Sequence, residues 1–181
     1  MRLAEREIKD PHTIGQVLDG CDIMTVALQD GAAPYVVPVN FDYQWSEGHW
    51  TFYFHCAPEG KKLDCLAAHP QVGLCCCRFL DYHGDEALPP HNKKEDYASV
   101  IATGTARILQ GEEAVEALKR FAWRTASDDA WQKVKKMPGN LLMVAIDVAQ
   151  LTCKVENPDP AWMPEILRLM QATVRVRPRM S

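Results

Sequence analysis

The sequence predicts a mainly β-sheet domain with a few peripheral helices. In several segments apolar and polar residues alternate with the two-residue period of a half-buried strand, and turn residues separate these segments. Fewer segments show the three- to four-residue period of an amphipathic helix. With 181 residues and 47% hydrophobic content, the chain is long and apolar enough to build one complete core.

Six segments are predicted as strands. The first three read as a meander, because Asp30-Gly31 and Ser46-Glu47-Gly48 are typical turn sequences. The fifth is long enough to run through a barrel wall, and the polar stretch 81–94 before it is expected to be an exposed loop. The predicted strands are residues 23–28, 35–43, 50–56, 72–80, 97–109 and 141–155.

The alternation assigns faces to the second and third strands. Their apolar rows are Tyr35, Val37, Val39, Phe41 and Tyr43 in one strand, and Trp50, Phe52 and Phe54 in the next. If the two strands pair with these rows matched, Asn40, Tyr53 and His55 share a mixed polar surface on the other face. Pro38 lacks an N–H group and therefore marks an edge strand or a bulge, two readings that the sequence leaves open.

Helices are predicted over residues 11–19, 59–69 and 111–125, each with an apolar stripe. After three prolines, a further amphipathic helix is predicted over 165–173, and its stripe must pack on the domain or on a second subunit. The basic residues near this end are interpreted as a solvated tail. We therefore divide the chain into a domain of residues 1–156 and a C-terminal helical tail of residues 157–181.

The second predicted helix begins with Lys61 and Lys62. A helix start is electropositive, so two lysines there have the unfavourable charge unless an anion binds between them. A phosphate held by helix N–H groups and two ammonium groups would resolve this conflict. The alternative is an ordinary exposed helix face, and the segment alone does not decide between them.

The composition excludes several classes of function. A net charge of -4 argues against a general nucleic-acid binder, and the chain has no apolar segment of transmembrane length and no N-terminal signal region. Seven cysteines without metal-ligand spacing indicate reduced thiols, and we expect a cytoplasmic protein without a metal site. Because neighbouring strand residues face opposite ways, Cys75, Cys76 and Cys77 cannot converge on one ion, and we interpret them as small core residues whose further function stays open.

Several motifs, taken in order, resemble one known family. They are Pro34-Tyr35-Val36-Val37-Pro38-Val39-Asn40-Phe41, Tyr53-Phe54-His55-Cys56-Ala57, Gly60-Lys61-Lys62-Leu63, and Tyr97-Ala98-Ser99-Val100 followed by Gly104-Thr105-Ala106. In order and spacing they resemble the pyridoxamine 5'-phosphate oxidase-like flavoproteins, specifically the branch of the 5-nitroimidazole resistance proteins. The resemblance covers about residues 5–155 and leaves out the tail.

The resemblance implies a six-stranded, Greek-key-like split β-barrel that binds FMN, as a homodimer with the flavin at the subunit interface. It implies that Lys61 and Lys62 hold the FMN phosphate. The backbone of Pro38, Val39, Asn40 and Phe41 would line the flavin ring, with Tyr53 and Ser99 also at the cofactor site. His55 would lie close to the flavin as the residue that contacts the substrate or handles a proton.

Two departures limit what the resemblance implies. The residues with which the true oxidases bind pyridoxine 5'-phosphate are not evident, and Cys56 stands where a serine is frequent. The leading hypothesis is therefore an FMN-dependent oxidoreductase that reduces a small organic acceptor, such as a nitroaromatic. The alternatives are a flavin carrier without turnover and a haem-binding split barrel, for which His55, His83 and His91 are conceivable ligands. The substrate and the electron donor stay open.

Overall fold

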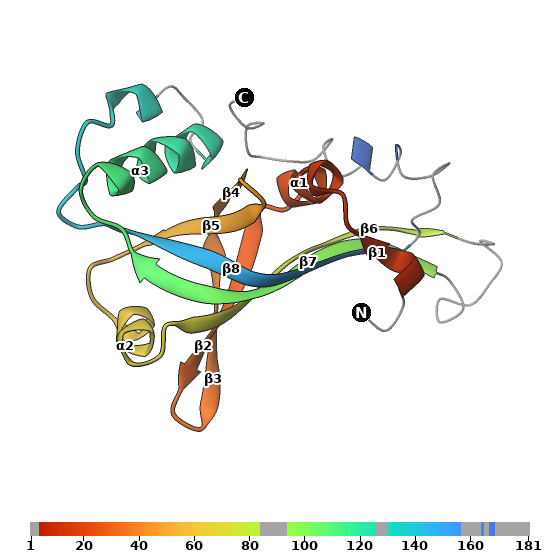
Figure 1. The fold of residues 1–181 in the computed structure, drawn as a ribbon, viewed down its shortest axis with the longest axis horizontal. Helices are drawn as coiled ribbons and strands as arrows, with labels where there is room; N and C mark the ends of the chain where they lie inside the picture. The colour runs from red at the N-terminus through yellow and green to blue at the C-terminus, as the bar shows by residue number, and fades with distance from the viewer. Residues whose placement is uncertain (1–3, 84–93, 126–129, 157–163, 165–166, 169–181) are drawn as a thin grey trace.

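The computed structural model describes residues 4–83, 94–125, 130–156, 164 and 167–168. Eight strands form one antiparallel sheet in the order β3-β2-β6-β7-β8-β5-β4, and β1 pairs with β8 off this path. The strands are β1 (Glu7–Ile8), β2 (Ile23–Asp30), β3 (Ala33–Asn40), β4 (Asp42–Ser46), β5 (His49–Cys56), β6 (Gln71–His83), β7 (Lys94–Ile108) and β8 (Leu142–Val155). Figure 1 shows the sheet curling so that β3 returns towards β5.

Three α-helices accompany the sheet: α1 (Pro11–Asp19), α2 (Lys61–Ala68) and α3 (Gly111–Thr125). Short 3-10 helices cover Ala4–Arg6 and Ala130–Lys133. In Figure 1, α3 lies over β5 and β8, while α2 sits near the β2–β3 hairpin at the other side. In the part of the chain that the structure describes, no helix has the length and apolar character that crossing a bilayer requires.

The architecture confirms a mainly β, split-barrel fold, but eight strands replace the six expected. Residues 35–43 do not form one strand, because β3 ends at Asn40, Phe41 intervenes, and β4 begins at Asp42. Strand β3 pairs with β2 and β4 pairs with β5, so both pairings of the expected three-strand meander are present, but its middle strand is divided in two. The two-residue β1 is the other addition.

The expectation of an exposed loop over residues 81–94 is wrong at both ends. Strand β6 continues to His83 and β7 begins at Lys94, with Asp81 paired to Asp96 and His83 to Lys94. Polar residues can continue a strand where the backbone groups of two antiparallel chains pair with each other. Residues 84–93 lie outside the described part of the chain.

The predicted apolar rows are confirmed as the inner wall of the barrel. Val39, Phe41 and Tyr43 are buried from one row, and Trp50, Phe52 and Phe54 are buried from the other, while Tyr35 and Val37 pack partly against the same core. Helix α1 adds Ile14, Val17 and Leu18 to this core. Of the predicted tail, only Pro164, Leu167 and Arg168 are described, and Leu167 packs partly buried against the barrel core.

A second, smaller core lies between α3 and the outer face of the sheet. Leu118 and Phe121 of α3 pack there with Met143 and Ala145 of β8. Helix α3 therefore covers the outer face of β5 and β8, whereas α1 packs against the barrel core on the inner side.

The pairing of β7 with β8 is irregular at Gly104. A Cβ atom at this position would lie 2.4 Å from the carbonyl oxygen of Asp147, so the close approach of β7 and β8 requires glycine. The register shifts here, because Thr103 pairs with Gln150 and Gly104 pairs with Val148, leaving Ala149 as the extra residue of a bulge. The bulge lies just beyond Asp147, the last residue of β8 that pairs with β5.

Candidate functional site at the gap between β3 and β5

The barrel is open between β3 and β5, which approach each other without forming a ladder in the described structure. We call this opening the split and define it by Tyr35 and Asn40 of β3, Phe54 and His55 of β5, and Lys61 and Lys62 of α2. The chain passes from β3 to β4 at Phe41. Strand β3 pairs with β2, whereas β4 pairs with β5. The free edge of β3 leaves backbone polar groups without a neighbouring strand.

Helix α2 opens directly on its two lysines. Gly60 precedes them with φ 114°, a conformation that favours glycine, and no side chain caps the helix start by a hydrogen bond. The expected helix over 59–69 is thus confirmed in essence, with Lys61 as its first residue. An uncapped, electropositive helix start is the arrangement that favours an anion.

The two lysines have different partners. Lys61 Nζ lies 2.5 Å from Asp30 Oδ2 and 5.0 Å from the ring centre of Tyr35, and the contact with Asp30 raises the pKa of Lys61. Lys62 Nζ lies 5.8 Å from the ring centre of Phe54. Among the described residues, no ion pair is formed by Lys62. One cation is therefore tied to the β2–β3 hairpin, and the other is available to a ligand.

His55 ends the row of outward residues on β5. Its side chain is exposed at the surface, yet its ring packs edge-on against Phe121 with the centres 4.9 Å apart. Partial burial, and secondly the charge of Lys62, lower the pKa of His55 below its ordinary value of 6.5. The imidazole is consequently neutral at pH 7 and can accept or donate one hydrogen bond at each nitrogen.

The residues of β3 divide by face. Val39 and Phe41 point into the core, so only their backbone can reach a ligand, while Pro38 and Asn40 are exposed on the outer face. Asn40 is the last residue of β3 and pairs with Ile23 of β2. Of the two readings of Pro38, the edge strand is confirmed, because β3 is an edge strand whose register with β2 is regular.

Tyr53 is held beneath α3, away from the lysines. Its hydroxyl donates to Gln44 Oε1 at 3.3 Å, and the guanidinium of Arg120 lies 5.2 Å from its ring centre. Arg120 also bonds to Asp42 at 3.0 Å and to the Tyr43 carbonyl at 2.9 Å. Burial raises the pKa of Tyr53, so this hydroxyl is a structural donor.

Ser99 lies on the outer face of β7, paired with Cys77 and Lys154. Asn40 and Ile23 continue the same cross-strand row at one end of β2, whereas Asp30, the partner of Lys61, lies seven residues further along this strand. At about 3.3 Å per residue, roughly 23 Å of strand separates them. A single chain therefore does not bring Ser99 to the lysines.

Sequence reasoning missed the arginines of α3. Arg124 is 1% exposed, donates to Asp19 Oδ1 at 2.7 Å and to the Leu18 carbonyl at 3.0 Å, and stacks 5.2 Å from the ring centre of Phe41. Asp19 also accepts from the Tyr43 hydroxyl at 2.9 Å. Because Arg124 falls within the apolar stripe of α3, the sequence could have indicated that it is buried. Its partners on α1 could not be predicted, because they are about a hundred residues away in the chain.

The cysteine run separates by face, as expected for a strand. Cys76 is fully buried in the core, and this burial raises its pKa, while Cys75 is half-buried and Cys77 exposed on the outer face. The small-core interpretation therefore holds for Cys76 alone. Within the described ranges, no cluster of three His, Cys, Asp or Glu side chains could hold a metal ion. The side chain of His83 and the whole of His91 lie outside the described part.

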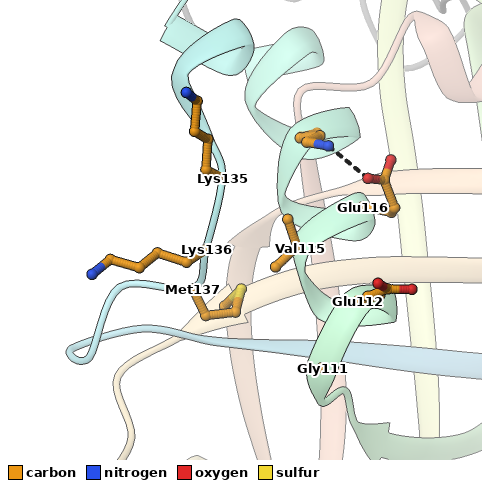
Figure 2. Close-up of a pocket in the computed structure, with 8 residues that line it drawn as sticks. Gly111, Glu112, Val115, Glu116, Lys135, Lys136 and Met137 are labelled. Carbon is orange, nitrogen blue, oxygen red and sulfur yellow. Dashed lines mark hydrogen bonds and ion pairs between the residues drawn. The ribbon is translucent and has the colours of Figure 1, made fainter.

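A cavity of about 700 Å³ lies apart from the split, between α3 and the segment before β8. Figure 2 shows Val115 and Met137 on its two walls, with Lys135 and Lys136 on the side away from Glu112 and Glu116. Glu116 pairs instead with Lys119 at 2.6 Å on its own helix. The opposite charges around this cavity do not converge, and we assign it no ligand.

The fold and the split define a split β-barrel with a basic helix start and a neutral histidine at its opening. The chain belongs to the family described as Pyridoxamine 5'-phosphate oxidase, which matches residues 10–155. This confirms the family expected from the sequence motifs. No curated protein matches the chain.

Solved structures with the same fold include three informative relatives. The flavocytochrome Anf3 from Azotobacter vinelandii superposes with a TM-score of 0.67 at 20% identity, covering 87% of this chain and 72% of its own. A putative 5-nitroimidazole antibiotic resistance protein from Bacteroides thetaiotaomicron VPI-5482 has a TM-score of 0.62 at 23% identity, covering 82% and 86%. The FAD and heme binding protein from Mycobacterium smegmatis has a TM-score of 0.62 at 15% identity, covering 94% and 82%. At these identities the likeness establishes the shared fold.

Proposed function

We propose that this protein binds FMN at the split and uses it to reduce a small organic acceptor. The observation that carries the proposal is the convergence of an uncapped helix start, the unpaired Lys62 and the neutral His55 on one opening of a flavin-family barrel. Relatives of the same fold are named for flavin, and one for 5-nitroimidazole resistance. A nitroaromatic is accordingly the acceptor we propose first.

The residues at the start of α2 fit a phosphate. A phosphate can bind Lys62 without displacing a carboxylate from it. The first N–H groups of α2, after Gly60, have no side-chain cap and can also bind the phosphate. Lys61 adds a second cation once the phosphate competes with Asp30 at an exposed ion pair. These groups give charge-assisted hydrogen bonds, which are stronger than neutral ones.

The outer part of the split fits a flavin ring and a substrate. FMN, when bound, supplies the hydride or electrons for the reduction. Asn40 and the free edge of β3 offer donors and acceptors for a ring edge, and His55 is exposed on β5 at the other side of the split. As a neutral imidazole near its titration range, His55 would first take a proton from water and could then pass it to an acceptor that gains electrons.

A second subunit accounts for Ser99. The outer face that carries Ser99 also exposes Val36, Phe79 and Ile101, each more than half exposed. We propose that a homodimer covers this face, so that Ser99 of one subunit serves the flavin held by its partner. A charged substitution, Ile101→Lys, should then shift the mass measured by light scattering from dimer to monomer and weaken FMN binding.

The cysteines suit a reducing compartment. All seven are free, and five of them are buried. We propose that the protein works in the cytoplasm, where such thiols stay reduced.

The absorption spectrum of the purified protein tests the proposal. A flavin band, with FMN identified by chromatography after heat release, supports it, and a colourless protein that ignores added FMN overturns it. Anaerobic reduction by NADH or NADPH, followed by a 5-nitroimidazole, then separates an enzyme from a flavin carrier. Flavin that stays reduced in the presence of the acceptor would favour the carrier.

Haem binding is the second candidate. It is favoured by the exposed neutral imidazole of His55 and by the haem in the names of structural relatives. A Soret band that His55→Ala abolishes would support it. A protein that takes up FMN but leaves hemin unbound would rule it out.

A further inference from the structure

A cavity of about 500 Å³ lies between α1 and the β4–β5 hairpin. It belongs to the end of the barrel that α1 covers, and none of the residues of the split lines it. Its described lining residues are Asp10, Pro11, His12, Gly15, Gln16, Asp19, Tyr43, Trp45 and Trp50.

One wall of the cavity is aromatic. Trp45 and Trp50 are directly opposite each other on β4 and β5, with ring centres 4.9 Å apart at 42°. Trp50 is buried, whereas Trp45 is 39% exposed, so part of an indole surface faces the open side of the cavity. The faces of indole rings carry the negative end of the ring quadrupole and attract cations.

The charged groups of the cavity are acidic. Asp10 and Asp19 line it, and among its described lining residues there is no lysine or arginine. Asp10 accepts hydrogen bonds from Thr13 N at 2.8 Å and Thr13 Oγ1 at 2.7 Å, which hold its pKa below the ordinary value and keep it anionic. Asp19 is fixed from behind by Arg124 and Tyr43 at 2.7 and 2.9 Å.

We propose that this cavity binds an organic cation of the substituted-ammonium class. An aromatic wall in the same cavity as carboxylates favours a positively charged group with an apolar surface, because ring faces and carboxylates both attract cations. Asp19 is paired with Arg124, so Asp10 is the carboxylate that would meet the cation. A neutral aromatic ligand would gain nothing from Asp10 and Asp19. A bare metal ion would find only two carboxylates and no third His, Cys, Asp or Glu in the described structure.

The full-length protein tests this with two matched probes. Choline carries a trimethylammonium group, and 3,3-dimethyl-1-butanol has nearly the same shape without charge. We expect saturable choline binding by calorimetry, at least tenfold tighter than binding of the alcohol. Equal binding of the two would overturn the proposal. So would the absence of choline binding at concentrations up to about 20-fold above a millimolar dissociation constant.

Two variants locate the site. Trp45→Ala should weaken choline binding roughly tenfold, the size of a cation–π contact at a partly desolvated ring. Asp10→Asn keeps a side chain that caps helices equally well but removes the charge, and should weaken binding several-fold with the melting temperature unchanged. Ile108→Ala, at an exposed apolar residue of β7 outside the cavity, is the control and should leave binding intact. Choline affinity unchanged in both site variants would contradict the assignment, whatever the protein does with flavin.

Discussion

Two cations of this barrel, Lys61 and Arg124, each lie over an aromatic ring but in very different surroundings. At the split, Lys61 lies 5.0 Å from the ring centre of Tyr35, and beneath α3 Arg124 lies 5.2 Å from that of Phe41. The lysine side chain is 56% exposed, while the arginine is 1% exposed and bonded to a carboxylate and to backbone carbonyls. Contact with a ring therefore does not tell a binding cation from a structural one.

The two kinds of cation differ in how deeply they are buried and in whether their N–H donors already have partners. A buried guanidinium must have its N–H groups satisfied, and only Nε of Arg124 lacks a partner in the described structure. An exposed ammonium can leave its donors to water and exchange them for a ligand at little cost. The arginines of α3 therefore belong to the architecture, and the lysines of α2 are available for chemistry.

The largest expected effect is at the structural cation. Arg124→Met should lower the free energy of unfolding by about 3 kcal/mol or more, because it leaves Asp19 partly buried without its counter-charge. Urea denaturation measures this. Arg107→Met is the matched control, since exposed Arg107 pairs with Glu113 and Asp147, and we expect a loss of about 1 kcal/mol or less. If both variants lost the same free energy of unfolding, the distinction between a buried structural cation and an exposed one would be wrong.

The next effect is at the available cation. Lys62→Ala should weaken FMN binding by roughly ten- to a hundredfold, the size of one or two charge-assisted hydrogen bonds. The free energy of unfolding should change by no more than about 0.5 kcal/mol, as at other exposed sites. Fluorescence titration of FMN gives the affinity, with Lys136→Ala as the control lysine. A large loss of stability with unchanged affinity would place Lys62 among the structural cations.

A smaller effect should follow from releasing Lys61. Asp30→Asn removes the carboxylate that holds this ammonium, and FMN affinity should rise by roughly a few-fold, since exposed ion pairs are weak. In that background, Lys61→Ala should cost more affinity than it does in the wild-type protein. Additive effects of the two substitutions would show that Asp30 does not compete with the phosphate.

The smallest effect is a titration. Because the folded pKa of His55 is lowered, the unfolded chain takes up this proton first as the pH falls below 6.5, and the contribution of His55 to stability declines until the folded pKa is passed. Lys62→Ala should raise the pKa of His55, and Phe121→Ala should raise it further, since burial is the larger cause. NMR titration of the imidazole measures both. A wild-type midpoint above 6.5 would contradict this assignment.

Local patterns in the sequence sufficed for much of the fold. The helices α1 and α3 fall on the predicted residues, because proline, glycine and a clear apolar stripe mark their ends. The inward rows of the strands were equally predictable, since one solvated face imposes a two-residue period. The lysines at the start of α2 were recognisable for the same reason, as a local conflict of charge.

What could not be predicted depends on partners distant in the chain. The division at Phe41 is invisible to periodicity, because Phe41 and Tyr43 both point inward although the pairing strand changes between them. The ion pair between Asp30 and Lys61, and that between Asp19 and Arg124, join elements that only the folded sheet brings together. The distance between Ser99 and the lysines likewise follows from sheet order, which no motif encodes.

The bulge at Gly104 and Ala149 has a consequence for how this chain can vary in length. On one side of it, β8 pairs with β5 over residues 142–147, and on the other side it pairs with β1 at Cys153 and Lys154. A residue inserted beyond the bulge would turn Cys153 and Val155 of β8 away from the barrel core, because neighbouring strand residues face opposite ways. Changes of length are therefore expected in the connections between strands, and the bulge shows one place where the ladder itself takes up an extra residue.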